Sequence, residues 1–470
     1  MLALATFSIP ILGSFLTLAA ARVSARLRNT LAVLIVLATF LCVLGLIPLA
    51  REGQSLGFGT LPIPGLNLSF MVDGLGVYVA VASSFVGLLI VLYSLDYMKE
   101  YEHLDEYYFL VVLFLGAMMG LVFSANLLVL YIFWEITAIC SWRLIGFYRK
   151  SQHLDNANAA LLITVFGSFL MLVGLEMIWH ETGTLDLTAL HGQPVSNLAL
   201  AFLLLGMLAK SAQVPLQVWL PAAGVAPSTV TALLHAAVLV VIGVFAFARL
   251  LVGGLGLPAA WQLPVLIIAI VTIFITGAAA LVENDAKRIL AYSTIAQLAY
   301  ILLGFAGLTS LSVAGALVFL LAHSLAKAGL FLCVGIIEHQ THTRDLRELG
   351  GLIRRMPVTA VAFILCALTI TGFPPTPGFF GKLMIVMGVL QSGNTVFAVL
   401  AVLGALVTLM YMLRLFTALF LGEERKPQAV EGTPIMLAVV AAFAGLSLAV
   451  GLGITPLLNA VNGIVLQMLR

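Results

Sequence analysis

The chain has little charge, few cysteines and no nucleotide-binding signature. Asp, Glu, Lys and Arg together make up 9% of its 470 residues, whereas hydrophobic residues make up 62%. A soluble protein of this length needs a larger polar surface, so the composition predicts a polytopic membrane protein. The basic residues are dispersed along the chain, and we therefore expect no nucleic-acid partner.

The scarcity of metal- and cofactor-binding residues narrows the chemistry further. The four cysteines lie in apolar stretches without the spacing of metal ligands, so small buried side chains are the better interpretation. The sequence contains no Walker A motif, dinucleotide-binding fingerprint or cluster able to bind haem or iron–sulfur. We expect no cofactor and no metal, and neither redox chemistry nor nucleotide hydrolysis by this chain alone.

Long apolar runs take up most of the chain. A run of about 20 apolar residues is long enough to cross the hydrocarbon core as a helix. Fourteen such segments follow one another, at residues 2–20, 31–50, 74–94, 107–124, 127–147, 157–179, 198–222, 228–252, 263–282, 289–308, 312–337, 357–391, 395–421 and 434–466. The first has no basic stretch and no clear cleavage site, so we expect a transmembrane helix rather than a removed signal peptide. The expected fold class is an all-α polytopic membrane protein with about 14 transmembrane helices.

Two of the segments are interrupted by helix-breaking residues. The seventh contains Pro215 and Pro221, and the twelfth contains Gly-Phe-Pro-Pro-Thr-Pro-Gly at residues 372–378. Proline removes a backbone donor and clashes with the preceding turn, so both helices should be discontinuous. Because these segments are five apart and antiparallel, we expect two inverted five-helix repeats around a site near the middle of the membrane.

The expected division of the chain follows from this arrangement. Residues 1–106 would form helices 1–3 with their loops, and residues 434–470 would form the last helix. The first repeat would cover residues 107–252 (helices 4–8), and the second would cover residues 263–421 (helices 9–13).

Lysine and arginine are distributed unevenly between the two sides of the expected bundle. Fourteen fall in loops that follow odd-numbered segments: Arg22, Arg26, Arg28, Lys99, Arg149, Lys150, Lys287, Arg288, Arg344, Arg347, Arg354, Arg355, Arg425 and Lys426. On the other side lie Arg51, Arg249 and Arg470. Basic loops remain in the cytoplasm, so we expect a multi-pass protein of the cell's inner (plasma) membrane with both termini on the outer side.

Five cations nevertheless fall inside apolar segments: Arg143, Lys210, Lys327, Lys382 and Arg414. An ionisable side chain at this depth costs about 2.5–3.5 kcal/mol, which marks it as a functional candidate. Only one comparably central acid, Glu135, could neutralise them. Arginine stays protonated whereas a buried lysine can release its proton, so we assign proton carrying to the lysines. The arginines are expected to set the local field or to bind backbone carbonyls and acids of neighbouring subunits.

Glu135 and Lys210 are both expected near the middle of the membrane, with Lys210 close to the break at Pro215. Burial disfavours an ammonium group, and a carboxylate within about 4–6 Å stabilises it. Movement of Glu135 away from Lys210 would therefore release a proton. The alternative is a static salt bridge that orients two helices, although such a pair barely offsets its own desolvation.

Histidines could connect the lysines. His323 and Lys327 are four residues apart and share a helix face, and His235 lies in the eighth segment. Histidine titrates near neutrality and can both donate and accept a proton. We therefore predict a proton relay of Glu135, Lys210, His235, His323, Lys327 and Lys382. Taken singly, each histidine could equally be a satisfied interior residue.

Two charged stretches have plainer interpretations. Glu283, Asp285, Lys287 and Arg288 form a short mixed-charge turn, which we expect to be solvated and locally paired. Residues 96–106 include several acids, and a solvated face is favoured there over a docking surface or a proton-collecting rim.

Seven stretches occur in an order that resembles one family. They include Trp134-Glu135 and His-Ser-Leu-Ala-Lys at residues 323–327, together with residues 70–76, 210–221, 232–237, 287–297 and 372–382. The chain is similar to the antiporter-like subunits shared by complex I (NADH:quinone oxidoreductase), membrane-bound hydrogenases and Mrp-type cation/proton antiporters. This resemblance implies a fourteen-helix core, two inverted repeats and a proton path through Glu135, Lys210, His235, Lys327 and Lys382.

The resemblance also implies partners. They are the lipid bilayer, other membrane subunits of the same complex joined by a central aqueous axis, and either a peripheral redox arm or, in the Mrp type, a sodium gradient.

Three positions depart from the family pattern. Gln217 stands where many relatives have histidine, Ser228-Thr229 replaces a common Thr-Pro, and Ile242 stands where Mrp and hydrogenase relatives often have lysine. The last two change local flexibility and remove one relay position, so the complete path is not assumed.

The preferred hypothesis is a proton-translocating, antiporter-like subunit of an energy-converting complex of the complex I or hydrogenase type. The first alternative is a subunit of an Mrp-type Na+/H+ antiporter. A hard cation needs a cage of oxygen ligands, and Glu135 is the one spare central carboxylate, so proton-only transport is preferred. The second alternative is a membrane coupling subunit of a bicarbonate-uptake complex.

Overall fold

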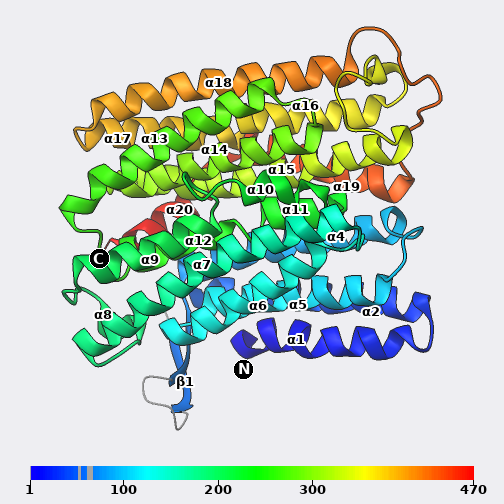
Figure 1. Cartoon of the computed structure of the whole chain (residues 1–470). Helices are drawn as coiled ribbons and strands as arrows, with labels where there is room; N and C mark the ends of the chain where they lie inside the picture. Colours follow the sequence, from blue (N-terminus) through cyan, green and yellow to red (C-terminus); the bar gives the residue numbers. More distant parts are fainter. Residues whose placement is uncertain (1, 51–53, 61–66, 470) are drawn as a thin grey trace.

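A computed structural model describes residues 2–50, 54–60 and 67–469 of the chain. Most of them belong to helices that run side by side in one bundle (Figure 1). Twelve helical segments in this described part are long and apolar enough to cross a membrane, with Ser228–Val252 counted as one. The all-α polytopic fold class is thereby confirmed. Two further predicted spans, the seventh and the twelfth, are divided into shorter helices.

The helices keep close to the expected segments. In the first half of the chain they are α1 (Leu2–Ala21), α2 (Ala25–Gly45), α3 (Ile47–Ala50), α4 (Gly74–Tyr97), α5 (Leu104–Phe123), α6 (Leu127–Ile145), α7 (Ser151–Thr182), α8 (Leu187–Leu190), α9 (Asn197–Lys210), α10 (Trp219–Ala222), the 3-10 helix η1 (Ala223–Val225), α11 (Ser228–Ala236), α12 (Val241–Phe247) and the π-helix η2 (Ala248–Val252). In the second half they are α13 (Ala259–Val282), α14 (Ala286–Ala306), α15 (Ser310–Thr341), the 3-10 helix η3 (Leu352–Arg354), α16 (Pro357–Thr371), α17 (Pro377–Gln391), α18 (Thr395–Phe420), α19 (Pro434–Leu452) and α20 (Ile454–Met468). The strands β1 (Gln54–Thr60) and β2 (Asn67–Val72) pair antiparallel as a hairpin.

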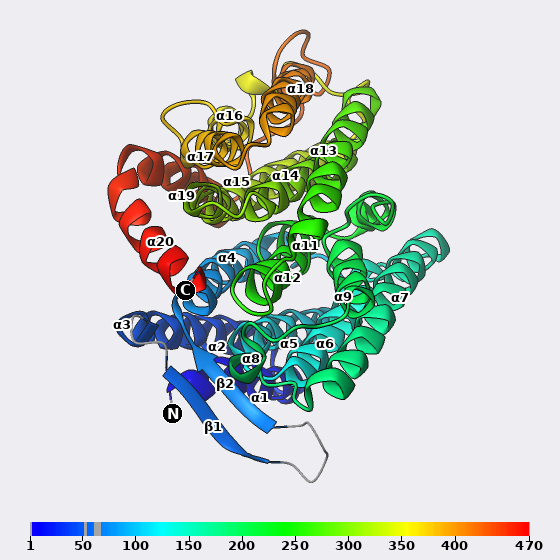
Figure 2. The ribbon, with the colours of Figure 1, turned by 90° about the vertical axis from the view of Figure 1, so that its left-hand side faces the viewer.

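The helices form two groups that meet at the centre. Figure 2, which looks along the bundle, shows the helices from α1 to α12 in one group and those from α13 to α19 in the other. Between the groups, α4 and α11 both pack against α15. Segment eight therefore joins the two halves of the molecule.

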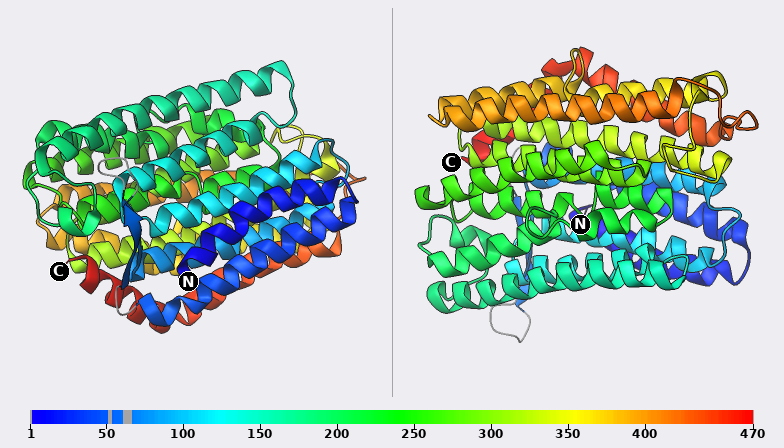
Figure 3. Two further views of the ribbon diagram at one scale, coloured as in Figure 1. Left: turned by 90° about the horizontal axis from the view of Figure 1, so that it is seen from below. Right: turned by 45° about the horizontal axis from the view of Figure 1, so that its top comes forward.

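The two ends of the bundle differ in charge. One end carries the turns with Arg22, Arg149 and Arg347, and we call it the basic end. The other end, the hairpin end, carries β1 and β2, which cross the helices there (Figure 3). Arg51 and Arg470, expected on the hairpin side, lie outside the described residues. Placement of the basic end in the cytoplasm stays a prediction.

Both predicted helix breaks are present. α9 ends at Lys210 and the chain is not helical again until α10, and a second gap separates α16 from α17. Gly372, in this second gap, has φ +84°, a conformation that favours glycine. A Cβ on Gly378 would lie 1.8 Å from the carbonyl oxygen of Thr369. The start of α17 therefore approaches the end of α16 closely enough to require glycine.

The eighth segment is also interrupted, which the sequence did not predict. Between α11 and α12, two backbone N–H groups bond to carbonyls five and six residues back, whereas an α-helix bonds four residues back. Side chains use the carbonyls that are freed. The backbone oxygen of His235 contacts His323, and that of Ala237 accepts the Ser83 hydroxyl at 2.6 Å.

The last apolar segment forms two helices instead of one. The chain bends at Gly453, between α19 and α20. From there α20 runs across the hairpin end toward β2 (Figure 2). It buries one face, through Val461, Ile464, Val465 and Met468. A helix with one apolar face fits a position along the bundle surface better than a membrane crossing.

Candidate functional site

Lys210 is the last residue of α9 and is completely buried. Its ammonium group donates to the carbonyl oxygen of Trp134 at 3.2 Å and to the hydroxyl of Thr137 at 3.0 Å, both on α6. The Trp134 ring centroid lies 5.2 Å from the same nitrogen. A cation in the last turn of a helix is stabilised by the helix dipole, so the break places Lys210 where its charge is best tolerated.

Glu135 directly follows Trp134 on α6, but it does not pair with Lys210. Its Oε1 is buried and has no hydrogen-bond partner among the described residues. Glu135 shares a helix face with Ile132 and Ile139, whose side chains are 45% and 57% exposed. The carboxylate thus lies near the edge of the chain. The static Glu135–Lys210 salt bridge that the sequence left open is not formed in this structure.

His235 and His323 connect the two groups of helices. Both are completely buried, and Nε2 of His323 on α15 lies 3.1 Å from the backbone oxygen of His235 at the end of α11. The His235 ring packs on Phe331 with centroids 4.5 Å apart, and neither ring nitrogen has a hydrogen-bond partner among the described residues. Buried polar atoms are nearly always paired. His235 is therefore not the satisfied interior residue of the plainer interpretation.

Lys327 lies one turn beyond His323 on α15 and is also completely buried. Its ammonium group donates to the carbonyl oxygen of Leu290 on α14 at 3.0 Å. The same oxygen accepts the hydroxyl of Thr294 at 2.9 Å. The predicted His323–Lys327 pair therefore faces α11 through its histidine and α14 through its lysine.

Lys382 lies on α17 beside the second helix break. Its ammonium group donates to the carbonyl oxygen of Ile370, in the last turn of α16, at 2.8 Å. The ring centroids of Tyr300 and Phe319 lie 4.4 Å and 5.2 Å from it. Carbonyls in the last turn of a helix have no partner within that helix, so the break supplies the acceptor that Lys382 uses.

The three lysines share one kind of environment. Each ammonium group bonds to uncharged oxygens of a neighbouring helix, and in the part of the chain that is described none of them is ion-paired. A buried charge without a counter-charge is costly. Such a site favours an amine that can give up its proton over one that serves as a permanent charge.

Arg143 and Arg414, which the sequence placed at membrane depth, lie toward the basic end instead. Arg143 is near the end of α6 and pairs with Glu106 in the first turn of α5. Arg414 donates to the carbonyl oxygen of Glu283 at 2.6 Å and to Oδ1 of Asn284 at 2.8 Å. The carbonyl-binding role is confirmed for Arg414. For Arg143 the partner is an acid of the same chain.

The sequence analysis did not predict a buried ion pair at the hairpin end. Arg249, assigned from the sequence to a helix end, is buried and pairs with Asp73, with its Nη2 2.8 Å from Oδ1. Asp73 also caps α4 by accepting the N–H of Gly76 at 2.9 Å. The Asp-Gly-Leu-Gly motif at residues 73–76 was the available signal, but it named no partner.

The charged turn before α14 is not the solvated loop that was expected. Arg288 and Glu283 do pair locally, at 3.1 Å. Lys287, however, is buried and lies 2.6 Å from Oε2 of Glu338 at the end of α15. It also donates to the carbonyl oxygen of Ala226 at 3.0 Å. Glu338 therefore neutralises Lys287. The two residues are far apart in the sequence, so no local pattern indicates the pair.

The acidic stretch at residues 96–106 largely has partners within the chain. Asp105 pairs with Arg28, and Glu106 pairs with Arg149 at 2.7 Å. Asp96 accepts the hydroxyl of Thr433. Glu102, by contrast, remains 92% exposed, as expected of a solvated face.

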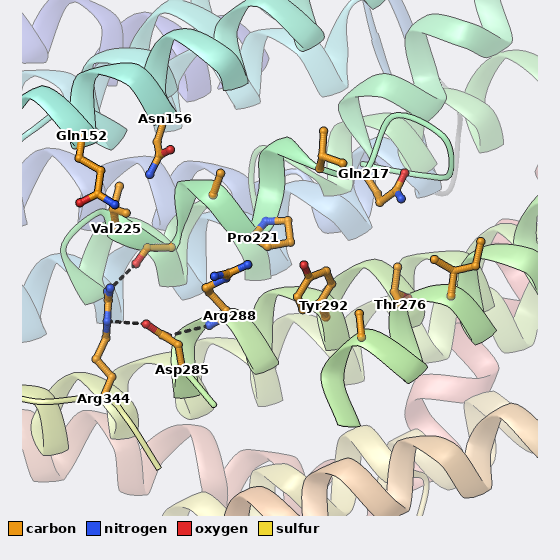
Figure 4. Close-up of a pocket in the computed structure, with 15 residues that line it drawn as sticks. Gln152, Asn156, Gln217, Pro221, Val225, Thr276, Asp285, Arg288, Tyr292 and Arg344 are labelled. Carbon is orange, nitrogen blue, oxygen red and sulfur yellow. Dashed lines mark hydrogen bonds and ion pairs between the residues drawn. The ribbon is translucent and has the colours of Figure 1, made fainter. Parts of the chain in front are cut away.

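Two cavities open at the basic end. The first, about 560 Å³, lies between α7, α13, α14 and the second part of segment seven, and extends from Arg344 and Arg288 to Gln217 (Figure 4). The second, about 590 Å³, is lined by Glu338 and by the turns before α7 and α14. Asp285 and Arg344 line both. Polar space thus reaches from the basic end into the bundle, as far as the break that follows Lys210.

Comparisons with known proteins agree with this architecture. The family model described as NADH:quinone oxidoreductase/Mrp antiporter, TM, matches residues 124–408, and the model described as NADH-Ubiquinone oxidoreductase (complex I), chain 5 N-terminus, matches residues 62–108. Among solved structures, a chain of the Mrp complex from Dietzia sp. DQ12-45-1b has a TM-score of 0.92 at 22% identity, covering 100% of this chain and 98% of that one. A chain of the membrane-bound sulfane sulfur reductase, an archaeal respiratory membrane complex, has a TM-score of 0.90 at 22% identity with the same coverage. At this identity these structures show the fold alone.

Relatives with higher identity are named as subunits of sodium/proton antiporters. The A1 subunit of a Na(+)/H(+) antiporter from Staphylococcus haemolyticus is 32% identical over 451 residues, which cover 87% of this chain and 56% of that protein. The A1 subunit from Staphylococcus saprophyticus is 33% identical over 412 residues, which cover 80% and 51%. The chain spans about half the length of the curated relatives it matches. It is a multi-pass integral membrane protein, and it belongs to the NADH:quinone oxidoreductase/Mrp antiporter family.

Proposed function

We propose that this chain is the proton-translocating, antiporter-like subunit of a multisubunit membrane complex. Protons move along Glu135, Lys210, His235, His323, Lys327 and Lys382. The observation that carries this proposal is that three buried ammonium groups bond to uncharged oxygens and, within the described part of the chain, to no carboxylate. A lysine held in this way can exchange its proton when a charge approaches or leaves, because its protonation depends on that charge.

Two inverted five-helix repeats form the frame of this path. The first extends from α5 to η2 and the second from α13 to α18. In each repeat the fourth segment is broken, and that break lies beside a lysine of the path: Lys210 at the end of α9 and Lys382 on the carbonyl of Ile370 in α16. Half-helices that end inside a membrane protein commonly build the transport site there.

The path continues from α6 into a neighbouring subunit. Glu135 lies on the face that carries the exposed Ile132 and Ile139. A carboxylate facing lipid at this depth is costly. A second membrane protein of the complex that covers this face removes the cost and supplies the group that draws Glu135 toward or away from Lys210.

The names of the relatives support a sodium gradient as the driving force. The proteins with 32% and 33% identity are named as subunits of Na(+)/H(+) antiporters. A peripheral redox arm, the partner preferred from the sequence, has only the fold-level likeness to a respiratory complex in its favour. We therefore place the chain in an Mrp-type complex.

The test uses the purified complex that contains this chain, reconstituted in vesicles with a pH-sensitive dye inside. A sodium gradient should drive proton movement without any electron donor. Proton movement that ignores sodium and needs an electron donor would assign the chain to a respiratory complex. Proton movement under neither condition refutes transport, and full partner activity in a variant that lacks Lys210, Lys327 and Lys382 would support a coupling role instead.

Replacing Lys327 by methionine should slow this proton movement about tenfold. Methionine fills a similar volume but carries no proton, whereas His323, one turn away, retains part of the relay. The measurement is the initial rate of dye response at equal amounts of complex. Lys99→Met, at an exposed position near the basic end, is the matched control and should leave the rate unchanged. Equal rates for both variants would remove Lys327 from the path.

A further inference from the structure

Glu338 occupies the boundary between water and the buried interior at the basic end. Its side chain is 27% exposed and lines the second cavity. On its inner side, Oε2 lies 2.6 Å from the buried ammonium of Lys287 and accepts the Ser228 hydroxyl at 3.2 Å. One carboxylate therefore contacts cavity solvent, a buried cation and a buried hydroxyl.

The groups that face Glu338 come from every element packed around it. Lys287 lies on α14, Ser228 on α11, and Arg344 in the turn after α15, with its Nη1 3.7 Å from Oε1. The Tyr97 hydroxyl, on α4, accepts the N–H of Ser228 at 3.4 Å. Arg344 is shared with Asp285, at 2.8 Å. Two cations therefore hold Glu338 in the second cavity, next to Arg344, which lines both cavities.

Stability alone gives little reason for this arrangement. A buried ion pair contributes little compared with an apolar pair of the same size, because both charges lose their hydration. Here the buried partner is Lys287, at 1% exposure, and the carboxylate is the member that reaches solvent. That asymmetry suits a group which takes protons from solvent and passes them inward.

Ser228 links Glu338 to the predicted relay. It is the first residue of α11, and His235 lies two helical turns further along the same helix. The ring nitrogens of His235 have no partner among the described residues. The helix that begins at the Glu338 contact thus ends at an imidazole whose bonding positions are unfilled.

We propose that Glu338 is the group through which this chain takes up protons from the basic end. A hydronium ion in the second cavity transfers a proton to the carboxylate; one O–H bond forms on Glu338, one breaks on hydronium, and water remains in the cavity. The acid then gives this proton to Oγ of Ser228: one O–H bond breaks on Glu338, one forms on Oγ, and the original Ser228 hydroxyl proton passes to water. Carried by water over the two helical turns to His235, that proton forms an N–H bond on the imidazole. Lys287 acts as a positioning residue that holds the carboxylate against Ser228. This inference rests on the proton transport proposed above.

The test compares three variants of Glu338 and Lys287 in the reconstituted complex. Glu338→Gln should slow proton movement about tenfold, because the amide cannot carry the proton. Glu338→Asp should retain most of the rate. The double variant Glu338→Gln with Lys287→Met should stay slow. A merely structural ion pair predicts the opposite for the double variant, because removing both charges together restores a neutral interior.

A second measurement covers the case in which Glu338→Gln fails to assemble. Ser228→Ala removes one hydroxyl and should slow proton movement several-fold, whereas Ser84→Ala, which removes a buried hydroxyl bonded within its own helix, should not. Recovery of the rate in the double variant, or full rates in Glu338→Gln or in Ser228→Ala, would overturn the assignment. Lys210→Ala, assayed beside them, separates the two proposals. If that variant transports normally, proton transport by this path fails; if it is inactive while Glu338→Gln is normal, only the uptake role fails.

Discussion

Proton transport is expected to fall at least about a hundredfold when Lys210 is replaced by alanine. Lys210 is the one titratable side chain of the predicted relay between Glu135 on α6 and His235 on α11. Its ammonium group reaches the carbonyl of Trp134 and the hydroxyl of Thr137. Neither of these oxygens holds an additional proton at neutral pH, so neither can take over the proton that Lys210 carries. Without the lysine, the path is interrupted at the first helix break.

Two further variants distinguish proton carrying from a fixed charge. Lys210→Arg keeps the positive charge but cannot release a proton at an accessible pH, so it should be as inactive as Lys210→Ala. Lys99→Ala, at an exposed position near the basic end, should transport normally. The measurement is the dye response in vesicles that contain equal amounts of assembled complex. Substantial transport by Lys210→Arg would mean that Lys210 acts through its field alone.

Replacement of Gly378 by alanine is expected to destabilise the chain by at least about 3 kcal/mol. The added Cβ would lie 1.8 Å from the carbonyl oxygen of Thr369, which belongs to the backbone and cannot rotate away. Either α17 must move away from α16, or the second break must change shape. Both changes displace Lys382 from the carbonyl of Ile370, so stability and transport should be lost together.

The stability of the purified complex toward heat measures this effect. Gly445→Ala is the matched control, because Gly445 also lies within a helix but a Cβ there would meet nothing within 4 Å. It should be neutral or slightly stabilising, since alanine favours helix more than glycine does. A Gly378→Ala variant as stable as the control would contradict the close approach of the two half-helices.

The large features of the fold could be predicted because they depend on composition and local chemistry. Long apolar runs specify spanning helices, and Pro215 and the Gly372–Gly378 stretch specify breaks through missing donors and permissive backbone. The third break, between α11 and α12, covers residues 237–240, which include neither glycine nor proline. It depends on contacts of Ser83 and His323 with freed carbonyls, which no local pattern contains.

Within the predicted site, the sequence identified the buried lysines but not the groups to which they bond. The identity of Lys210, Lys327 and Lys382 as buried cations followed from their apolar surroundings, but their acceptors are backbone oxygens of other helices. The depth of Arg143 and Arg414 was misjudged because a long arginine side chain reaches toward the end of the bundle.

Lys287 was misassigned for a different reason. Charged neighbours in sequence suggested local pairing, whereas Glu338, its partner, comes from the end of another helix. Sequence patterns report the surroundings of a residue along the chain, and they do not report contacts made across the bundle.

The contact between His323 and the backbone oxygen of His235 fixes which nitrogen of the His323 ring carries hydrogen. A carbonyl oxygen can only accept a hydrogen bond, so Nε2 of His323 must carry hydrogen in this arrangement. The neutral ring is then the Nε2–H tautomer, and an arriving proton can attach only at Nδ1, which has no partner among the described residues. Departure from the opposite nitrogen breaks the link to α11. Each proton that passes through His323 therefore requires either a turn of the ring or a movement of the interruption between α11 and α12. Proton transfer through this histidine is thus a candidate for the slow step of turnover.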